Sequence, residues 1–150
     1  MKVFTLKKID ENDSKIIQGE LLRRHVKYSW NKPANCITIA NHGNSGNIYI
    51  IYGIKLNLYD KIKSVDIFVG DDTCRVCSNR ESIFNLDYAS QSDMDAFLQI
   101  KETVSGKDGI FNVLGEDAFI ILPGGCIIIK FNEDVLSLEI DMKFKKEPID

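Results

Sequence analysis

The sequence predicts an all-β protein, mostly an antiparallel β-sandwich of the jelly-roll kind, with room for one or two short helices. Apolar and polar residues alternate with a period of two through much of the chain, which is typical of strands that bury one face. Many of the apolar residues are Ile, Val, Tyr and Phe, which suit a pleated surface. Turns rich in Gly, Asn and Pro separate the alternating segments at short intervals, and this spacing favours a sandwich over a parallel α/β sheet.

The clearest predicted strand lies near the C-terminus and has one apolar and one polar face. The apolar face carries Leu136, Leu138, Ile140, Met142 and Phe144. The intervening residues, from Ser137 to Lys145, are polar or charged. A helix would distribute these apolar side chains around its circumference, whereas a strand places all of them on one side. We therefore predict a strand over residues 136–144, followed by a solvated tail over residues 145–150.

A second long strand is predicted over residues 48–58. Its even-numbered positions from Ile48 to Leu58 are apolar and would share one face. The opposite face is apolar up to Ile51 and then becomes polar. This change indicates either a central strand that emerges toward an edge or a bend at Gly53.

The remaining predicted strands are short and are separated by turn sequences. They cover residues 3–9, 26–30, 36–41, 65–69, 83–88, 119–122 and 127–131. Turns are expected at residues 31–33, 41–46, 70–72 and 123–125, where Asn, Asp, Gly and Pro cluster. The secondary structure of two segments is left undecided. The segment from Ser92 to Val104 fits a helix or a strand, and residues 14–25 fit a short helix or an extended arm.

Length and composition describe one globular domain over residues 1–150, with residues 1–35 as an extended N-terminal arm. Hydrophobic residues make up 44% and charged residues 27%, and the formal net charge is −3. A nucleic-acid partner is not expected, because such proteins usually carry a positive excess. Neither a signal peptide nor an apolar run of roughly 20 residues is visible, so we expect a soluble cytoplasmic protein with no membrane partner.

The only sequence motif that is typical of a metal-binding or redox site is the Cys-x-x-Cys pair of Cys74 and Cys77. It would serve as half of a zinc site or as a redox pair. The other available ligands are Cys36, Cys126, His25 and His42, and they include no second close pair. Because a structural zinc needs four ligands, we interpret Cys74 and Cys77 as small residues on a strand or turn, and predict no metal and no cofactor.

No catalytic constellation is evident in the sequence. The two histidines, His25 and His42, have no nucleophile paired with them by a recognisable motif. The acidic doublets Asp71-Asp72 and Glu133-Asp134 lack the ligand spacing of a calcium loop and are interpreted as solvated turn residues. Glycine-rich phosphate loops are absent as well. We therefore predict that the protein is not an enzyme.

Aromatic residues leave a ligand-binding alternative open. They are Trp30, Tyr28, Tyr49, Tyr52, Tyr59 and Tyr88. Such side chains would line a sugar-binding face, although in a sandwich they more often fill the core or its rim.

Three segments carry a family resemblance. The first is Ile37 to Gly43, which leads into the second, Gly46 to Ile50; the third, Phe119 to Ile129, contains a Leu-Pro-Gly-Gly turn. Over residues 36–144 the chain resembles small β-sandwich structural proteins of tailed-bacteriophage particles, such as capsid decoration or tail proteins. Residues 59–115 and the N-terminal 35 residues have no counterpart in that pattern.

The resemblance implies a non-enzymatic virion structural protein, assembled in the host cytoplasm. Its expected partners are other copies of itself and neighbouring virion proteins, and the resemblance implies no catalytic residue. The alternatives are a ligand-binding β-sandwich module for carbohydrate or protein, and a small zinc or thiol protein that uses Cys74 and Cys77.

Overall fold

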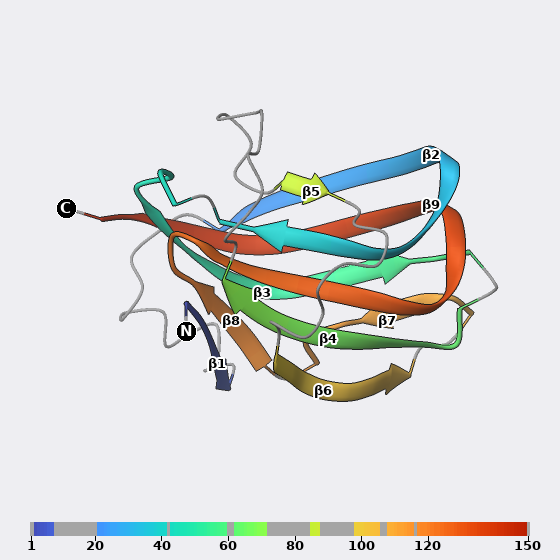
Figure 1. Ribbon diagram of the computed structural model, residues 1–150. Coiled ribbons are helices and arrows are strands. Elements are labelled where there is room, and N and C mark those ends of the chain that lie inside the picture. The colour runs from blue at the N-terminus through green and yellow to red at the C-terminus, as the bar shows by residue number, and fades with distance from the viewer. Residues whose placement is uncertain are drawn as a thin grey trace.

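The computed structural model describes residues 2–7, 21–41, 43–59, 62–71, 85–87, 98–105, 108–115 and 117–149 (Figure 1). The strands are β1 (Val3–Lys7), β2 (Leu22–Ala40), β3 (Asn47–Asn57), β4 (Ser64–Asp71), β5 (Asn85–Asp87), β6 (Leu98–Ser105), β7 (Ile110–Asn112), β8 (Asp117–Ile121) and β9 (Gly125–Pro148). All pairings between them are antiparallel. No helix occurs in the described residues, and the predicted all-β, antiparallel class is confirmed.

A long ribbon made of β2 and β9 runs through the structure. The two strands pair from one end of β2 to the other, with irregular register between Ser29 and Cys36. At that irregularity the ribbon bends back on itself (Figure 1). The described strands consequently belong to one hydrogen-bonded sheet. They do not form the two separate sheets expected of a sandwich, because β2 and β9 continue through the bend.

The bend divides the sheet into two leaves. In the first leaf, residues 22–29 of β2 pair with β9, which pairs with β3, followed by β8 and β1, while β7 also pairs with β3. In the second leaf, residues 36–40 of β2 lie between β5 and β9, and β9 is followed by β4 and β6. The inner faces of the two leaves contribute to a single hydrophobic core.

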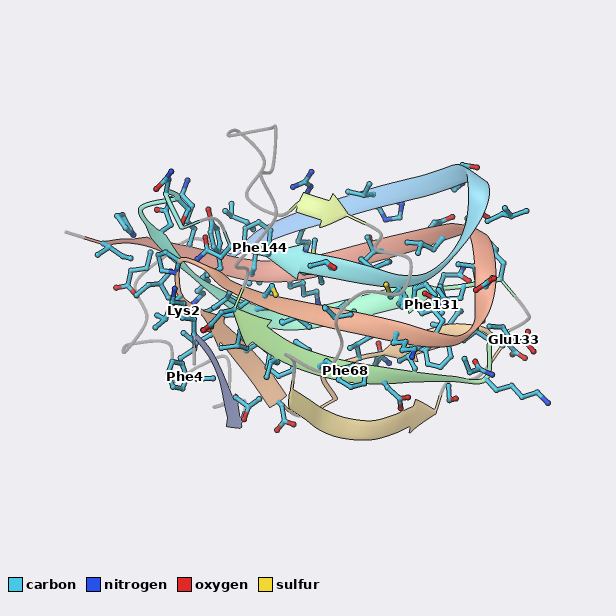
Figure 2. All side chains as sticks on the ribbon, in the orientation of Figure 1. Lys2, Phe4, Phe68, Phe131, Glu133 and Phe144 are labelled. Carbon is cyan, nitrogen blue, oxygen red and sulfur yellow. The ribbon has the colours of Figure 1, made fainter. Side chains whose placement is uncertain are left out.

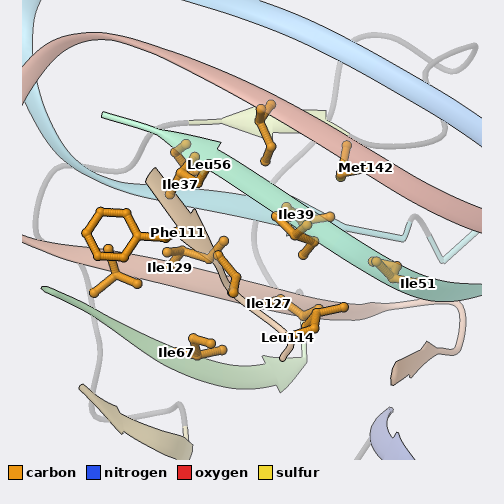
Figure 3. Packing of buried hydrophobic residues seen from close by; sticks show 14 of the residues in the cluster. Ile37, Ile39, Ile51, Leu56, Ile67, Phe111, Leu114, Ile127, Ile129 and Met142 are labelled. Carbon is orange, nitrogen blue, oxygen red and sulfur yellow. The ribbon is translucent and has the colours of Figure 1, made fainter. Parts of the chain in front are cut away.

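The core is made of large aliphatic and aromatic side chains from both leaves (Figure 3). From the second leaf come Ile37, Ile39, Ile67, Ile127 and Ile129, and from the first come Ile51, Leu56, Ile140 and Met142. Each of these is at most 2% exposed. Full burial of such a side chain contributes about 1.5–3 kcal/mol, so the two leaves are held together mainly by this layer.

The continuous strands correct two sequence predictions. The turn expected at residues 31–33 does not separate two strands; it falls inside β2, in the irregular part of the ladder. Pro33 lies there and has no N–H to donate, which is compatible with a local interruption of the ladder. Likewise, β9 joins the strands expected at residues 127–131 and 136–144, and Leu136, predicted to be buried, is 54% exposed beside the bend.

Parts of the predicted tail and of the predicted N-terminal arm are strands. Residues 145–148, predicted as a tail, pair with β3, although most of their side chains are exposed. Residues 3–7 and 22–35 of the expected N-terminal arm lie in β1 and β2. The open segment from Ser92 to Val104 is a strand from Leu98 onward, and residues 14–20 and 92–97 lie outside the described residues.

A register shift in β3 explains its two mixed faces. The shift lies between Ile51 and Gly53. Before it, Tyr49 and Ile51 are buried, and after it Ile54 and Leu56 are buried, so the inward face changes from odd to even positions. The bend that the sequence indicated at Gly53 is therefore a bulge. The prediction that all even-numbered apolar residues of this strand share one face was wrong.

Asn41 connects the segments that carry the family resemblance. Its side-chain Nδ2 donates to the carbonyl oxygens of Asn47 and Ile121, each at 2.9 Å. Its backbone N–H donates to Gly125 O at 2.9 Å, and its carbonyl accepts from the Gly124 N–H at 2.7 Å. Asn41 is fully buried. It therefore satisfies backbone groups at the ends of three strands, β3, β8 and β9, and in the turn before β9.

Gly125 allows the chain before β1 to cross close to the start of β9. A Cβ added at Gly125 would lie 2.6 Å from the carbonyl oxygen of Lys2 and 3.1 Å from Val3 Cγ2. The same Lys2 carbonyl accepts a hydrogen bond from the Leu122 N–H at 2.8 Å. Only glycine permits this approach, which helps to fix β1 against the first leaf.

Candidate functional site

The outer face of the first leaf carries a polar cluster built from cross-strand pairs. Alternate residues of β2 and β9 point outward and stand opposite one another in the register. The three pairs are Ser29 with Ser137, Lys27 with Glu139, and His25 with Asp141. The pairs follow each other along the ribbon from the bend toward the chain ends, so they form one continuous polar strip.

Glu139 is the centre of this cluster. Its Oε1 accepts a hydrogen bond from the Tyr59 hydroxyl and lies 3.3 Å from Lys27 Nζ. Its Oε2 lies 3.6 Å from His25 Nε2, while the other ring nitrogen of His25 contacts the carboxylate of Asp141. The carboxylate of Glu139 thus faces groups from two other segments, β2 and the turn after β3. This arrangement fixes the orientation of Tyr59 and Lys27.

The hydrogen bond between Tyr59 and Glu139 shifts both groups in opposite directions. The Tyr59 hydroxyl, and after it the Lys27 ammonium, lowers the pKa of Glu139 below its ordinary value of 4.5. The same hydrogen bond to the carboxylate raises the pKa of Tyr59 above 10.0. Both shifts favour the pairing of a neutral phenol with a charged carboxylate.

The lowered pKa predicts how the cluster responds to acid. The folded state binds the Glu139 proton more weakly than the unfolded chain, so its contribution to stability is present above about pH 4.5 and is lost as the pH falls through the lower folded value. We expect Glu139→Gln to be less stable than the wild type at pH 7, with the difference closing below about pH 4.5. Urea denaturation across this pH range measures it. A difference that stays constant with pH would contradict the assignment, and Glu133→Gln, at an exposed position near the bend, is the control.

Tyr59 reaches the cluster through an unusual turn after β3. Its φ is +49°, in the left-handed region. Its N–H donates to the side chain of Asn57 at 3.1 Å, and the neighbouring Leu58 is buried and donates its N–H to Gly109 O at 2.8 Å. A non-glycine residue in this conformation costs on the order of 1–3 kcal/mol and persists only when its surroundings hold it. The turn therefore fixes the direction of the Tyr59 side chain.

A shallow pocket lies between Tyr59 and the ribbon. It has a volume of about 270 Å³ and is lined by Lys27, Ser29, Tyr59 and Ser137. The paired serines are small, which leaves a hollow between the longer side chains around them. The lining offers an aromatic ring, two hydroxyls and an ammonium group, with the Glu139 carboxylate beside them. We call this the Tyr59 pocket.

The structure places only some of the residues singled out from the sequence. Cys74, Cys77, His42, Asp72 and Tyr88 lie outside the described residues, as do the side chains of Tyr28 and Trp30. Cys36 and Cys126 are both buried. Among the residues that the structure describes, no three His, Cys, Asp or Glu side chains are grouped so that they could hold a metal ion.

The tyrosines that could be placed have three different roles. Tyr49 belongs to the core, where its ring meets that of Phe144 edge-to-face at 6.1 Å. Tyr52 lies half-buried on the outer side of the bulge, with Lys145 Nζ 5.5 Å from its ring centre. Tyr59 is 40% exposed beside the pocket. The acidic residues Asp71, Glu133 and Asp134 are exposed, but they lie in strands β4 and β9 and not in the turns that the sequence predicted.

The sequence analysis did not predict most of the polar cluster around Glu139. The sequence offered His25 only as a zinc ligand or as a catalytic histidine without a partner, while Lys27 and Glu139 fell in two separate predicted strands. A signal was present, because His25, Lys27 and Ser29 alternate in the same way as Ser137, Glu139 and Asp141. Pairing them required the register between segments more than 100 residues apart.

No protein-family model matches the chain, and the search of curated proteins found no match either. In the described part of the chain, no helix is long and apolar enough to cross a membrane.

Proposed function

We propose that this protein is a non-enzymatic structural component of a virus particle, capsid-associated or in the tail, that acts by associating with copies of itself and with neighbouring particle proteins. The viral setting is supported by the sequence resemblance of residues 36–144. The mode of association is supported by β1, which has β8 as its one strand partner among the described residues. In this proposal the protein is assembled in the host cytoplasm and binds neither nucleic acid nor membrane.

The edge strand β1 carries the proposal. Among the described residues, β8 is the only strand that pairs with β1. Phe4, in the middle of β1, is 46% exposed and lies near the N-terminal end of the structure (Figure 2). An open edge offers unpaired backbone groups to another chain, and an exposed aromatic side chain adds apolar area to that contact. These features suit a strand that pairs between subunits.

A second open edge is protected by charge. Residues 22–29 of β2 have β9 as their described strand partner on one side only. Their outward side chains include Arg23, His25 and Lys27, all exposed. Charged side chains on an edge discourage pairing with a further strand. The contrast favours β1 over this edge of β2 as the edge that associates.

Light scattering coupled to size-exclusion chromatography tests the proposal. We expect the wild type to have a mass of at least two subunits, each of 17.0 kDa. Phe4→Lys should shift the distribution toward the monomer, because it places a charge on the proposed contact edge. The matched control is Leu136→Lys, which makes the same kind of change at an exposed apolar residue beside the bend. A monomeric wild type at all concentrations, or an equal response of the two variants, would contradict association through β1.

A further inference from the structure

We infer that the Tyr59 pocket binds a single saccharide ring, stacked on Tyr59 and hydrogen-bonded by Ser29, Ser137 and Lys27. The inference concerns a different surface from β1 and does not depend on the proposed assembly. The observation that carries it is the juxtaposition of a held aromatic ring, two serines that are paired in the strand register and the ammonium group of Lys27 around one hollow.

The size of the hollow selects the class of ligand. Pockets for drug-sized molecules measure about 300–1,000 Å³. The Tyr59 pocket, at about 270 Å³, lies just below that range and opens to the surface of the sheet. It therefore suits one ring-sized group, with the rest of a larger molecule projecting away from the protein.

The hydrogen-bonding groups suit a hydroxylated ligand. Ser29 and Ser137 each donate and accept, and Lys27 only donates. A sugar hydroxyl also donates and accepts, so neighbouring hydroxyls on a ring find complementary partners here. Lys27 lies 3.3 Å from Glu139, so its charge is compensated within the site. This compensation disfavours a simple anion or cation as the ligand.

Tyr59 supplies the apolar surface that a sugar ring requires. One face of a pyranose carries C–H groups, and tyrosine combines an aromatic face with a polar tip. The tip is already engaged with Glu139, and the backbone is held by Asn57 and by the buried Leu58. A side chain that is ordered before binding loses little conformational entropy on binding. The left-handed turn costs conformational energy, and in this proposal its role is to hold the Tyr59 ring in the orientation that binds the sugar.

Ligand-observed NMR with free monosaccharides tests this inference. The probes are glucose, galactose, mannose and N-acetylglucosamine, each titrated against the full-length protein. We expect saturable binding of at least one of them with Kd in the millimolar range, which corresponds to about −4 kcal/mol. Tyr59→Ala should weaken that binding by about tenfold or more, as expected for loss of a central aromatic contact. Ser137→Val, which removes a hydroxyl and fills the hollow, should also weaken it.

The matched control is Tyr52→Ala, which removes a half-buried tyrosine of the same strand region that does not line the pocket. It should retain wild-type affinity. Absence of saturable binding for all four sugars, or an equal loss in Tyr52→Ala and Tyr59→Ala, would overturn the inference. Preferential binding of inorganic phosphate or acetate would overturn it too, because it would show Lys27 acting as a free cation. Phe4→Lys should leave sugar binding unchanged, so failure of the assembly proposal and failure of this one are distinguishable.

Discussion

Asn41→Ala should lower the free energy of unfolding by about 1–3 kcal/mol, because it removes the amide donor from the buried Ile121 carbonyl, whereas the partly buried Asn47 carbonyl keeps the Ser45 hydroxyl as a donor. Both amide hydrogen bonds, to Asn47 O and Ile121 O, would be lost. The Oδ1 atom of Asn41 has no partner among the described residues, so its removal returns part of the loss. Urea denaturation monitored by circular dichroism measures the change. A loss below about 1 kcal/mol would show that water or rearrangement replaces the amide.

Thr38→Val is the matched control for Asn41→Ala. Thr38 is also buried and polar, but its hydroxyl has no hydrogen-bond partner in the described part of the chain. Valine has nearly the same shape, and replacing an unsatisfied hydroxyl by a methyl group removes a desolvation penalty of about 1–3 kcal/mol. We expect this variant to be as stable as the wild type or more stable. The two variants together separate the effect of hydrogen bonding from that of lost polarity.

Gly125→Ala should destabilise the protein by about 1–3 kcal/mol or more, as overpacking at a close contact does. The added Cβ would meet the Lys2 carbonyl oxygen at 2.6 Å, and a backbone atom cannot rotate away as a side-chain tip would. The segment before β1 must then shift, which weakens the bond from the Leu122 N–H to Lys2 O. Thermal denaturation measures the loss of stability.

The control for Gly125→Ala is Gly43→Ala. A Cβ at Gly43 would meet no atom within 4 Å, so we expect a change within about 0.5 kcal/mol. Equal effects of the two substitutions would show that the crossing of Lys2 over Gly125 does not hold β1. If β1 is the contact edge between subunits, Gly125→Ala should also reduce association at temperatures where the monomer stays folded.

The fold class was accessible from the sequence because alternation is a local property. The buried series Leu138, Ile140, Met142 and Phe144 follows directly from the period of a strand. Leu136 has the same parity but is exposed, because the ribbon bends beside it and the inward direction changes. The bend and the bulge near Gly53 depend on what each strand pairs with, which local patterns do not encode.

The candidate site was less accessible than the fold. His25, Lys27 and Glu139 are ordinary charged residues on the polar sides of two strands, and nothing in their local sequence distinguishes them from a solvated face. Their proximity follows from a register that joins residues near the two ends of the chain. Tyr59 reaches Glu139 only through a left-handed turn, and the sequence around it contains no glycine to suggest one.

The paired ribbon of β2 and β9 also determines when this protein becomes able to fold. Even the nearest paired residues, Ala40 and Cys126, are separated by most of the chain. At a synthesis rate of about 5–20 residues per second, β2 leaves the ribosome several seconds before its partner exists. Closing so long a loop is entropically costly, and sheets dominated by distant pairings fold slowly. During that interval the exposed charges of Arg23 and Lys27 would keep the nascent strand from pairing with the nascent strands of neighbouring ribosomes.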